Sequence, residues 1–195
     1  KRAAVVGPGI GTGPECAALV RWLVTARPLP LVLDADALNC LATLGPDHER
    51  PADPPPLILT PHPGEMARLT GQSAAAIQSD RLAVARAAAT RYAAVVVLKG
   101  ARTVVAAPDG RAWINLSGNA GLAAGGTGDV LAGIIASLLG QGYAPEDAAT
   151  LGVFLHGHAA DRIAARRGMI GLIASDLIEE LPPTMLELLD LAADA

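Results

Sequence analysis

The chain has 195 residues, of which 51% are hydrophobic and 17% are charged. This length and apolar content allow one domain with a sizeable core, expected over residues 1–195, and they exclude a disordered or low-complexity segment. The formal net charge is −4 and aromatic residues make up only 3%. The chain therefore lacks the basic stripe and the stacking surface of nucleic-acid-binding proteins, which favours small-molecule chemistry.

Two further absences concern the cellular compartment. No apolar run reaches the roughly 18 residues that a membrane span needs, and the first residues lack the apolar core of a signal peptide. Cys16 and Cys40 lie far apart in the sequence and have no Cys-x-x-Cys partner, which indicates reduced thiols. We expect a cytoplasmic protein with no membrane segment.

The first element is a short apolar run over residues 3–6, followed by a glycine-rich segment over residues 7–13. A helical pattern begins at Pro14, a residue suited to a first helical turn. This order predicts strand, glycine loop and helix. Thr12 stands where the third glycine of the dinucleotide fingerprint belongs, so a Rossmann dehydrogenase is only weakly supported, and no P-loop motif is present.

The second buried strand is expected over residues 31–34 and ends in acidic residues. Asp34, Asp36 and Asn39 come just beyond the carboxyl end of this strand, which is where open parallel sheets bind ligands. Capping of the next helix by Asp34 or Asp36 is an equal alternative.

A third strand, residues 57–60, follows a surface loop expected over residues 46–56 and leads into Thr-Pro-His-Pro-Gly-Glu at residues 60–65. Because the two prolines fix the backbone around His62, we interpret this histidine as a substrate contact, against the alternative of a structural role. Glu65 could cap the next helix or orient a metal-bound water, and both roles stay open.

A long alanine-rich helix, expected over residues 74–92, leads into a strand over residues 95–98. That strand ends at Lys99, and residues 103–106 are predicted to pair with residues 111–115 as a hairpin. The segment from Lys99 to Thr103 offers a cation, a glycine and a hydroxyl at one strand end, which suits a nucleotide phosphate. A solvated lysine is the alternative.

A second glycine-rich segment, residues 119–133, runs directly into an apolar helical pattern. Free backbone N–H groups, the helix dipole and the absence of Cβ atoms make such a helix start an anion site. Asp129 brings a negative charge to this place. It is interpreted either as a cap or as a base held beside a phosphate.

Histidines 156 and 158 lie in the helix expected from Pro145 onward, and their spacing of two turns them to different sides of that helix. They are therefore not a metal pair, and no residue is assigned to a metal. Residues 171–181 are predicted to form a short capped helix.

Alternating strands and helices indicate an α/β fold of three layers, with a mainly parallel central sheet flanked by helices and one β-hairpin. Five motifs, taken together and in this order, resemble the C-terminal domain type of ADP/ATP-dependent NAD(P)H-hydrate dehydratases, which are ribokinase-like in fold. The motifs are Gly-Pro-Gly-Ile-Gly at 7–11, Leu-Asp-Ala-Asp-Ala-Leu-Asn at 33–39, Thr-Pro-His-Pro-Gly-Glu at 60–65, Leu-Lys-Gly-Ala-Arg-Thr at 98–103 and Ala-Gly-Gly-Thr-Gly-Asp-Val-Leu-Ala-Gly at 124–133.

The resemblance implies a metabolite-repair lyase that returns hydrated NADH or NADPH to the intact cofactor. ADP or ATP would be the co-substrate, with Mg²⁺ as cofactor. Asp129 would be the catalytic base, and Gly9, His62 and Asp129 would bind the hydrated substrate. The nucleotide would be bound by Lys99, Gly100, Ala101, Arg102, Thr103, Gly125, Gly126, Thr127 and Gly128.

The resemblance also implies a further segment of several tens of residues upstream of residue 1, and it leaves a homo-oligomer open. Two other functions are kept as alternatives. One is a ribokinase-like small-molecule kinase of the hydroxymethylpyrimidine or hydroxyethylthiazole type, although such kinases tend to have asparagine at the position of His62. The other is a catalytically silent nucleotide-binding module.

Overall fold

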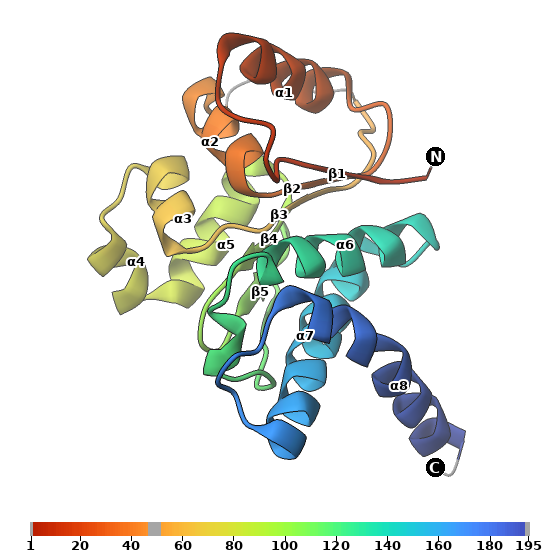
Figure 1. Ribbon diagram of the computed structural model, residues 1–195. Helices are drawn as coiled ribbons and strands as arrows, with labels where there is room; N and C mark the ends of the chain where they lie inside the picture. Colours follow the sequence, from red (N-terminus) through yellow and green to blue (C-terminus); the bar gives the residue numbers. More distant parts are fainter. Residues whose placement is uncertain (1, 47–51, 194–195) are drawn as a thin grey trace.

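The central sheet has six strands, and their order across the sheet is their order along the chain. Figure 1 labels β1 to β5 in this order. The sheet is seen in a computed structural model that describes residues 2–46 and 52–193. Strands β1 to β4 are parallel, whereas β5 and β6 form an antiparallel hairpin on β4. The mainly parallel sheet with one hairpin is therefore confirmed. The strands are β1 (Ala4–Val6), β2 (Leu31–Leu33), β3 (Leu57–Leu59), β4 (Val95–Leu98), β5 (Val104–Ala106) and β6 (Ala112–Ile114).

One face of the sheet is covered by the helices that connect β1 to β4. Each of these connections advances one strand in the same direction, and connections of one hand then leave their helices on one face. Leu31, Leu33 and Leu59 point from the strands into the core beneath these helices. The helices are α1 (Pro14–Ala26), α2 (Ala35–Leu44), α3 (Pro63–Thr70), α4 (Ala74–Ser79) and α5 (Arg81–Tyr92).

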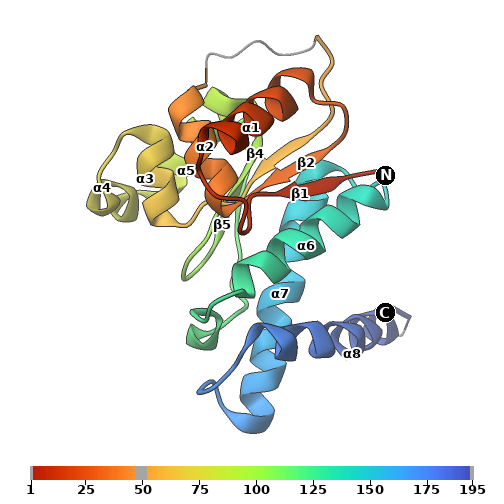
Figure 2. The same ribbon diagram turned by 45° about the horizontal axis from the view of Figure 1, so that its top comes forward.

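The opposite face is covered by α6 (Thr127–Gly140) and α7 (Pro145–Arg167), which lie across the sheet from α1 and α2 (Figure 2). Because side chains alternate along a strand, Val32, Ile58 and Val97 point to this second core. Helix α8 (Ala174–Ala193) packs on α6 and α7. The three-layer arrangement is thus confirmed.

The helix expected over residues 74–92 is wrong as one element, because it divides at Asp80. Asp80 Oδ1 accepts a hydrogen bond from the Ala83 amide at 3.0 Å, and Ser73 Oγ accepts one from the Ala76 amide at 3.2 Å. Each polar side chain caps the helix that follows it. Two caps therefore make two helices, α4 and α5. Part of the loop expected over residues 46–56 lies outside the described residues.

Helix α8 is longer than the short helix predicted over residues 171–181. It continues through Pro182 and Pro183, both of which are exposed. Each proline removes a helical donor. However, Leu177, Leu181 and Leu188 share the inner face at helical spacing and pack against the two cores nearby. Among the described residues, no helix combines the length and apolar character needed to cross a bilayer.

Candidate functional site

The carboxyl ends of β1 to β4 meet at one edge of the sheet. The register pairs Val6 with Leu33, Leu33 with Leu59 and Leu59 with Val96. The residues that follow β1, β2 and β3 therefore begin at the same level, and β4 continues two residues farther, to Leu98. The Asp34 amide donates to the Val6 carbonyl at 3.1 Å, and the Lys99 amide donates to the Pro61 carbonyl at 2.8 Å. These bonds hold the loops after neighbouring strands together.

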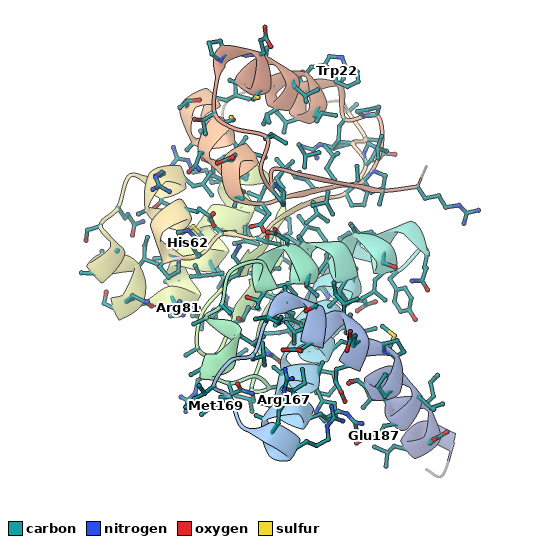
Figure 3. The ribbon with its side chains drawn as sticks, in the orientation of Figure 1. Trp22, His62, Arg81, Arg167, Met169 and Glu187 are labelled. Carbon is teal, nitrogen blue, oxygen red and sulfur yellow. The ribbon has the colours of Figure 1, made fainter. Side chains whose placement is uncertain are left out.

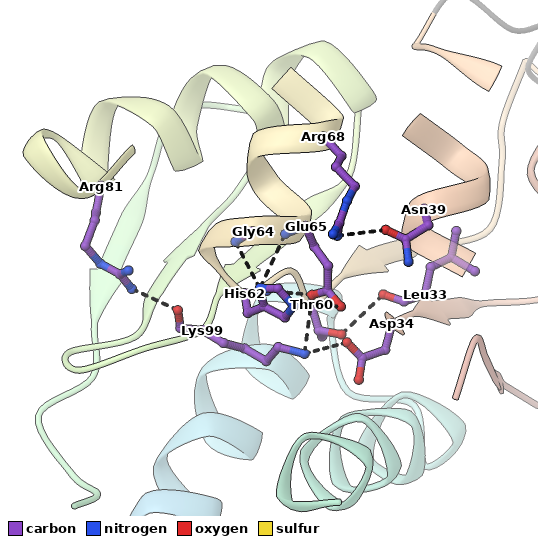
Figure 4. A network of polar contacts seen from close by, with 10 residues as sticks. All are labelled: Leu33, Asp34, Asn39, Thr60, His62, Gly64, Glu65, Arg68, Arg81 and Lys99. Carbon is purple, nitrogen blue, oxygen red and sulfur yellow. Dashed lines mark hydrogen bonds and ion pairs between the residues drawn. The ribbon is translucent and has the colours of Figure 1, made fainter. Parts of the chain in front are cut away.

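The side chains of Lys99 and Asp34 form an ion pair at this edge (Figure 4). Lys99 Nζ lies 2.6 Å from Asp34 Oδ1 and 3.8 Å from Glu65 Oε2. The Asp34 side chain is only 2% exposed and that of Lys99 is 19% exposed. Lys99 is therefore not the solvated lysine of the alternative interpretation.

His62 is the N-terminal cap of α3. Its Nδ1 accepts hydrogen bonds from the amides of Gly64 at 2.9 Å and Glu65 at 3.3 Å, and Glu65 Oε2 accepts one from the His62 amide at 2.7 Å. This is a reciprocal capping box. Because Nδ1 accepts, the proton of a neutral ring sits on Nε2. The side chain is still 52% exposed, so the structural role leaves the ring free to contact a ligand.

The second glycine loop leads into α6 beside the Lys99–Asp34 pair. A Cβ atom added at Gly128 would lie 3.5 Å from Lys99 Nζ and 3.8 Å from Asp34 Oδ2. Gly128 is in the first turn of α6, where backbone N–H groups lack helical partners. Thr127 Oγ1 donates to the carbonyls of Leu122 and Ala124 at 2.7 and 2.9 Å, which fixes the loop.

His156 supports the same turn from α7. Its Nε2 lies 2.8 Å from the Thr127 carbonyl. Burial lowers the pKa of His156 from 6.5 to about 4, so the ring is neutral near pH 7 and donates this bond through Nε2–H. From the sequence, His156 was only excluded from a metal pair, and its contact with the first turn of α6 was not predicted. The available signal was its place on the inner helical face shared with Ala149, Val153 and Ala160, all of them buried.

One cavity of about 660 Å³ joins the segment after β4 to the first turn of α6. All five residues of the segment from Lys99 to Thr103 line it, together with Thr127 and Gly128, so the structure brings these expected nucleotide-binding residues together. Gly125 and Gly126 do not line it. The other lining residues are Asn115, Leu116, Ser117, Gly118, Asn119, Ala120, Leu122, Ala123, Leu131, Val153, His156 and Gly157.

Arg81, on α5, supports the part of the cavity wall that begins at Lys99. Its Nη2 donates to the carbonyls of Leu98 at 2.9 Å and Lys99 at 3.3 Å. Arg81 lies half-buried against the end of β4, and Figure 4 shows its guanidinium directed at the Lys99 backbone; Figure 3 labels it in the whole molecule. Burial lowers the pKa of the Arg81 guanidinium.

Asp129 is exposed on the first turn of α6. It does not line the cavity with Lys99. It lines a second, mainly apolar cavity of about 490 Å³ between α6 and α8, together with residues such as Ile134 and Ile178. Among the described residues no hydrogen bond to its carboxylate is found, so the capping alternative has no support. Asp129 and Gly128, adjacent in the chain, thus face two neighbouring cavities.

The first glycine loop approaches the acidic residues after β2. The Gly11 amide donates to Asp36 Oδ2 at 2.9 Å, so Asp36 fixes this loop while Asp34 binds Lys99. Gly9 is exposed in the loop and lines neither of the two cavities. The cluster of Asp34, Asp36 and Asn39 is therefore divided, since Asn39 accepts instead from Arg68 Nη1 at 3.1 Å.

The described residues contain no group of three or more His, Cys, Asp or Glu side chains placed to hold a metal ion. Asp34 and Glu65 are carboxylates at the sheet edge, but both face the Lys99 ammonium. The protein side chains of this part of the chain therefore do not form a metal centre by themselves.

The chain covers about a third to three fifths of two curated relatives that it matches. It is 52% identical over 181 residues to the bifunctional NAD(P)H-hydrate repair enzyme of Moorella thermoacetica. This match covers 91% of this chain and 33% of that protein. It is 48% identical over 175 residues to the ADP-dependent (S)-NAD(P)H-hydrate dehydratase of Neisseria meningitidis, over 89% of this chain and 59% of that protein.

Solved structures give the same relationship. The ADP/ATP-dependent NAD(P)H-hydrate dehydratase of Bacillus subtilis, co-crystallised with ATP and Mg²⁺, has a TM-score of 0.85 and 37% identity over 95% of this chain and 64% of that one. A ribokinase-like superfamily protein of Enterococcus faecalis has a TM-score of 0.79 and 26% identity over 95% of this chain and 63% of that one. The family model for NAD(P)H-hydrate dehydratase matches residues 1–183. The chain therefore belongs to the NAD(P)H-hydrate dehydratase family, with a ribokinase-like fold.

Proposed function

We propose that this chain carries out the nucleotide-dependent dehydration of hydrated NADH and NADPH, with ADP or ATP as co-substrate. The observation that carries the proposal is the cavity of about 660 Å³ that joins Lys99–Thr103 to the first turn of α6. It combines a cation, free backbone N–H groups and enough volume for a nucleotide. The ADP-dependent activity named for the Neisseria relative supports this assignment.

The chemistry has two steps. The terminal phosphoanhydride bond of the nucleotide breaks, AMP or ADP leaves, and the phosphoryl group passes to the hydroxyl oxygen on the hydrated ring, while Asp129 accepts the hydroxyl proton. The ring carbon–oxygen bond then breaks, inorganic phosphate leaves with the bonding electrons, and loss of a proton from the adjacent carbon restores the double bond. Base catalysis by Asp129 typically supplies about 10²- to 10⁴-fold in rate.

The nucleotide would lie along Lys99–Thr103, with its terminal phosphate at the loop Gly125–Gly128 and Lys99 Nζ beside it. The N–H groups of this loop and the ammonium would stabilise charge on the transferring group. Asp129 faces the neighbouring cavity, so the hydrated ring would approach from that side. Gly9 and His62 would contact the rest of the hydrated substrate.

Magnesium is proposed to arrive with the nucleotide, because Mg²⁺ in such sites is held largely by substrate phosphates. It would neutralise phosphate charge. Cys16 and Cys40 are both free thiols, which together with the nucleotide co-substrate supports a cytoplasmic protein. A homo-oligomer stays a prediction.

The test is to incubate the protein with hydrated NADH, Mg²⁺ and either ADP or ATP, and to follow the recovery of NADH absorbance. Recovery that depends on nucleotide is expected. Turnover of a pyrimidine or thiazole alcohol without recovery would favour the small-molecule kinase. Nucleotide binding without turnover of any substrate would favour the silent module.

A further inference from the structure

Asp34 stands at a helix start without capping it, and the backbone around it is strained. Asp34 occupies the N-cap position of α2, yet its side chain makes no capping hydrogen bond. The next residue, Ala35, has φ of +48°, a left-handed conformation that costs a non-glycine residue about 1 kcal/mol or more. Gly7 approaches so closely that an added Cβ would lie 1.7 Å from the Asp34 carbonyl oxygen. Such local strain is typically kept where a side chain has a function.

The buried carboxylate of Asp34 is directed at Lys99. The separation of 2.6 Å is that of a charge-assisted hydrogen bond, and Asp34 is 2% exposed. Glu65 Oε2 lies on a second side of the same ammonium at 3.8 Å. A lysine stem is flexible and tends to extend its charge toward water. Here two carboxylates hold the charge inside.

The place where the ammonium is held is the first turn of α6. A Cβ at Gly128 would lie within 3.5 Å of Lys99 Nζ, so a phosphate oxygen on the N–H groups of this turn would meet the ammonium directly. A displacement of about 1 Å at such a position can cost about 10²-fold in rate. The position of Lys99, and not only its charge, is therefore functionally important.

We propose that Asp34 is a positioning residue for the reaction, which acts by holding the Lys99 ammonium against the first turn of α6, where the transferring phosphoryl group binds. This proposal rests on the proposed function for the meaning of the site. Asp34 itself touches Lys99, so its effect on turnover passes through that residue.

A double-mutant cycle tests this route. Asp34→Asn, which keeps the side-chain shape, should lower kcat/KM by about 10²-fold. Lys99→Met should lower it at least as much, and adding Asp34→Asn to Lys99→Met should cause no further loss. An independent loss in the Lys99→Met background would overturn the proposal. The matched control is Asp109→Asn, which breaks an exposed ion pair with Arg111 at the far end of the hairpin and should leave kcat/KM unchanged.

A second measurement needs no turnover, because Lys1 and Lys99 are the only lysines in the sequence. Trinitrobenzenesulfonate modifies amines, and peptide mapping separates the two sites. Lys99 should react several-fold faster in Asp34→Asn than in the native protein, and ADP should protect it in the native protein. An unchanged rate, or no protection by ADP, would overturn the proposal even where hydrated NADH is turned over.

If Asp34→Asn fails to fold, Lys99→Arg serves in its place, since it keeps the charge and moves it. The proposal expects Lys99→Arg to lose about tenfold or more in kcat/KM, as a misplaced charge should. Native activity in Lys99→Arg would contradict it. Failure of the native protein to restore NADH would reject the proposed function. The lysine-labelling experiment needs no turnover, so it would still test whether Asp34 holds Lys99 in place.

Discussion

His62 illustrates how one side chain can serve the fold and the proposed site together. Its Nδ1 caps α3, while about half of the side chain remains exposed at the sheet edge. The flanking prolines at 61 and 63 indicated a fixed imidazole, but they gave no sign of a capping box. Histidine is an unusual cap, so propensity alone would not have suggested this role.

Asp129→Asn should abolish turnover and leave nucleotide affinity almost unchanged. The reason is that Asp129 lines the cavity beside α8, whereas residues 99–103, which are proposed to bind the nucleotide, line the other cavity. The measurement is ADP affinity by calorimetry alongside the NADH-recovery rate. A large loss of ADP binding would show that the aspartate belongs to the nucleotide site.

We expect His156 to make the free energy of unfolding depend on pH. Its pKa is about 4 in the folded chain, lowered by burial, against about 6.5 unfolded. Between these values the unfolded state binds more protons, so stability should fall as pH decreases from 6.5 to 4 and be fully present above 6.5. At pH 4 the free energy of unfolding should be about 3 kcal/mol lower, from this group, than it is above pH 6.5.

Urea unfolding at pH 7 and pH 4.5 would measure it, with His156→Gln as the matched variant. Glutamine can still donate to the Thr127 carbonyl but does not titrate in this range. The native protein should therefore lose more stability than His156→Gln over this interval. Parallel losses in both proteins would mean that other groups account for the pH dependence.

At the scale of the element, the strand ends were more predictable than the helices. Short apolar runs located β1 to β4, and the pairing predicted between residues 103–106 and 111–115 located the hairpin. Pairing between Asp34 and Lys99 could not be predicted, because it joins residues 65 positions apart and depends on the register of three strands. The split at Asp80 was missed because apolar spacing outweighed a single capping residue.

Arg81 ties helix α5 to the start of the segment from Lys99 to Thr103, which is proposed to bind the nucleotide, and Arg81→Ala should loosen that segment. We expect the nucleotide KM to rise by about tenfold, since two hydrogen bonds to the carbonyls of Leu98 and Lys99 are lost. Steady-state kinetics with varied ADP would show this. Arg86→Ala, an exposed change on the same helix, should have a native KM; an equal rise in both variants would point to α5 as a whole.

At the scale of the whole molecule, α8 is held to α7 by ion pairs as well as by its apolar face. Glu180 Oε1 accepts from Arg162 Nε at 2.8 Å and from Arg166 Nη1 at 2.9 Å. The hydrogen bonds from Arg166 and Arg162 lower the pKa of Glu180. Glu187 also pairs with Arg162, on the side of the molecule where Arg167 and Glu187 are labelled (Figure 3).

Glu180→Gln should weaken this attachment locally, because the amide keeps the shape but loses the charge that both arginines face. Hydrogen exchange in α8 should become faster while the strand amides β2 to β4 keep their protection. Glu179→Gln, which changes the neighbouring exposed carboxylate, is the control. Uniformly faster exchange across the sheet would mean that α8 does not open separately.

The layers could be predicted from the sequence, but the boundary between the two cavities could not. Alternation along the strands separates Leu31 and Leu33 from Val32 and thereby defines two cores. That Gly128 and Asp129 serve different cavities depends on how α8 packs on α6. Its continuation through Pro182 and Pro183 runs against local propensity, so tertiary packing decided it.

The strand order has a consequence for folding during synthesis on the ribosome. Because neighbours in the sheet are neighbours in the chain, each strand emerging from the ribosome finds its partner already made, and the sheet grows in the order of synthesis. Helices α1 to α5 cover one face of the sheet in turn, because each is synthesised between two strands. The face of Val32, Ile58 and Val97 stays exposed until α6 and α7 have been synthesised, and exposed apolar surface of this kind makes a partly folded chain prone to aggregation.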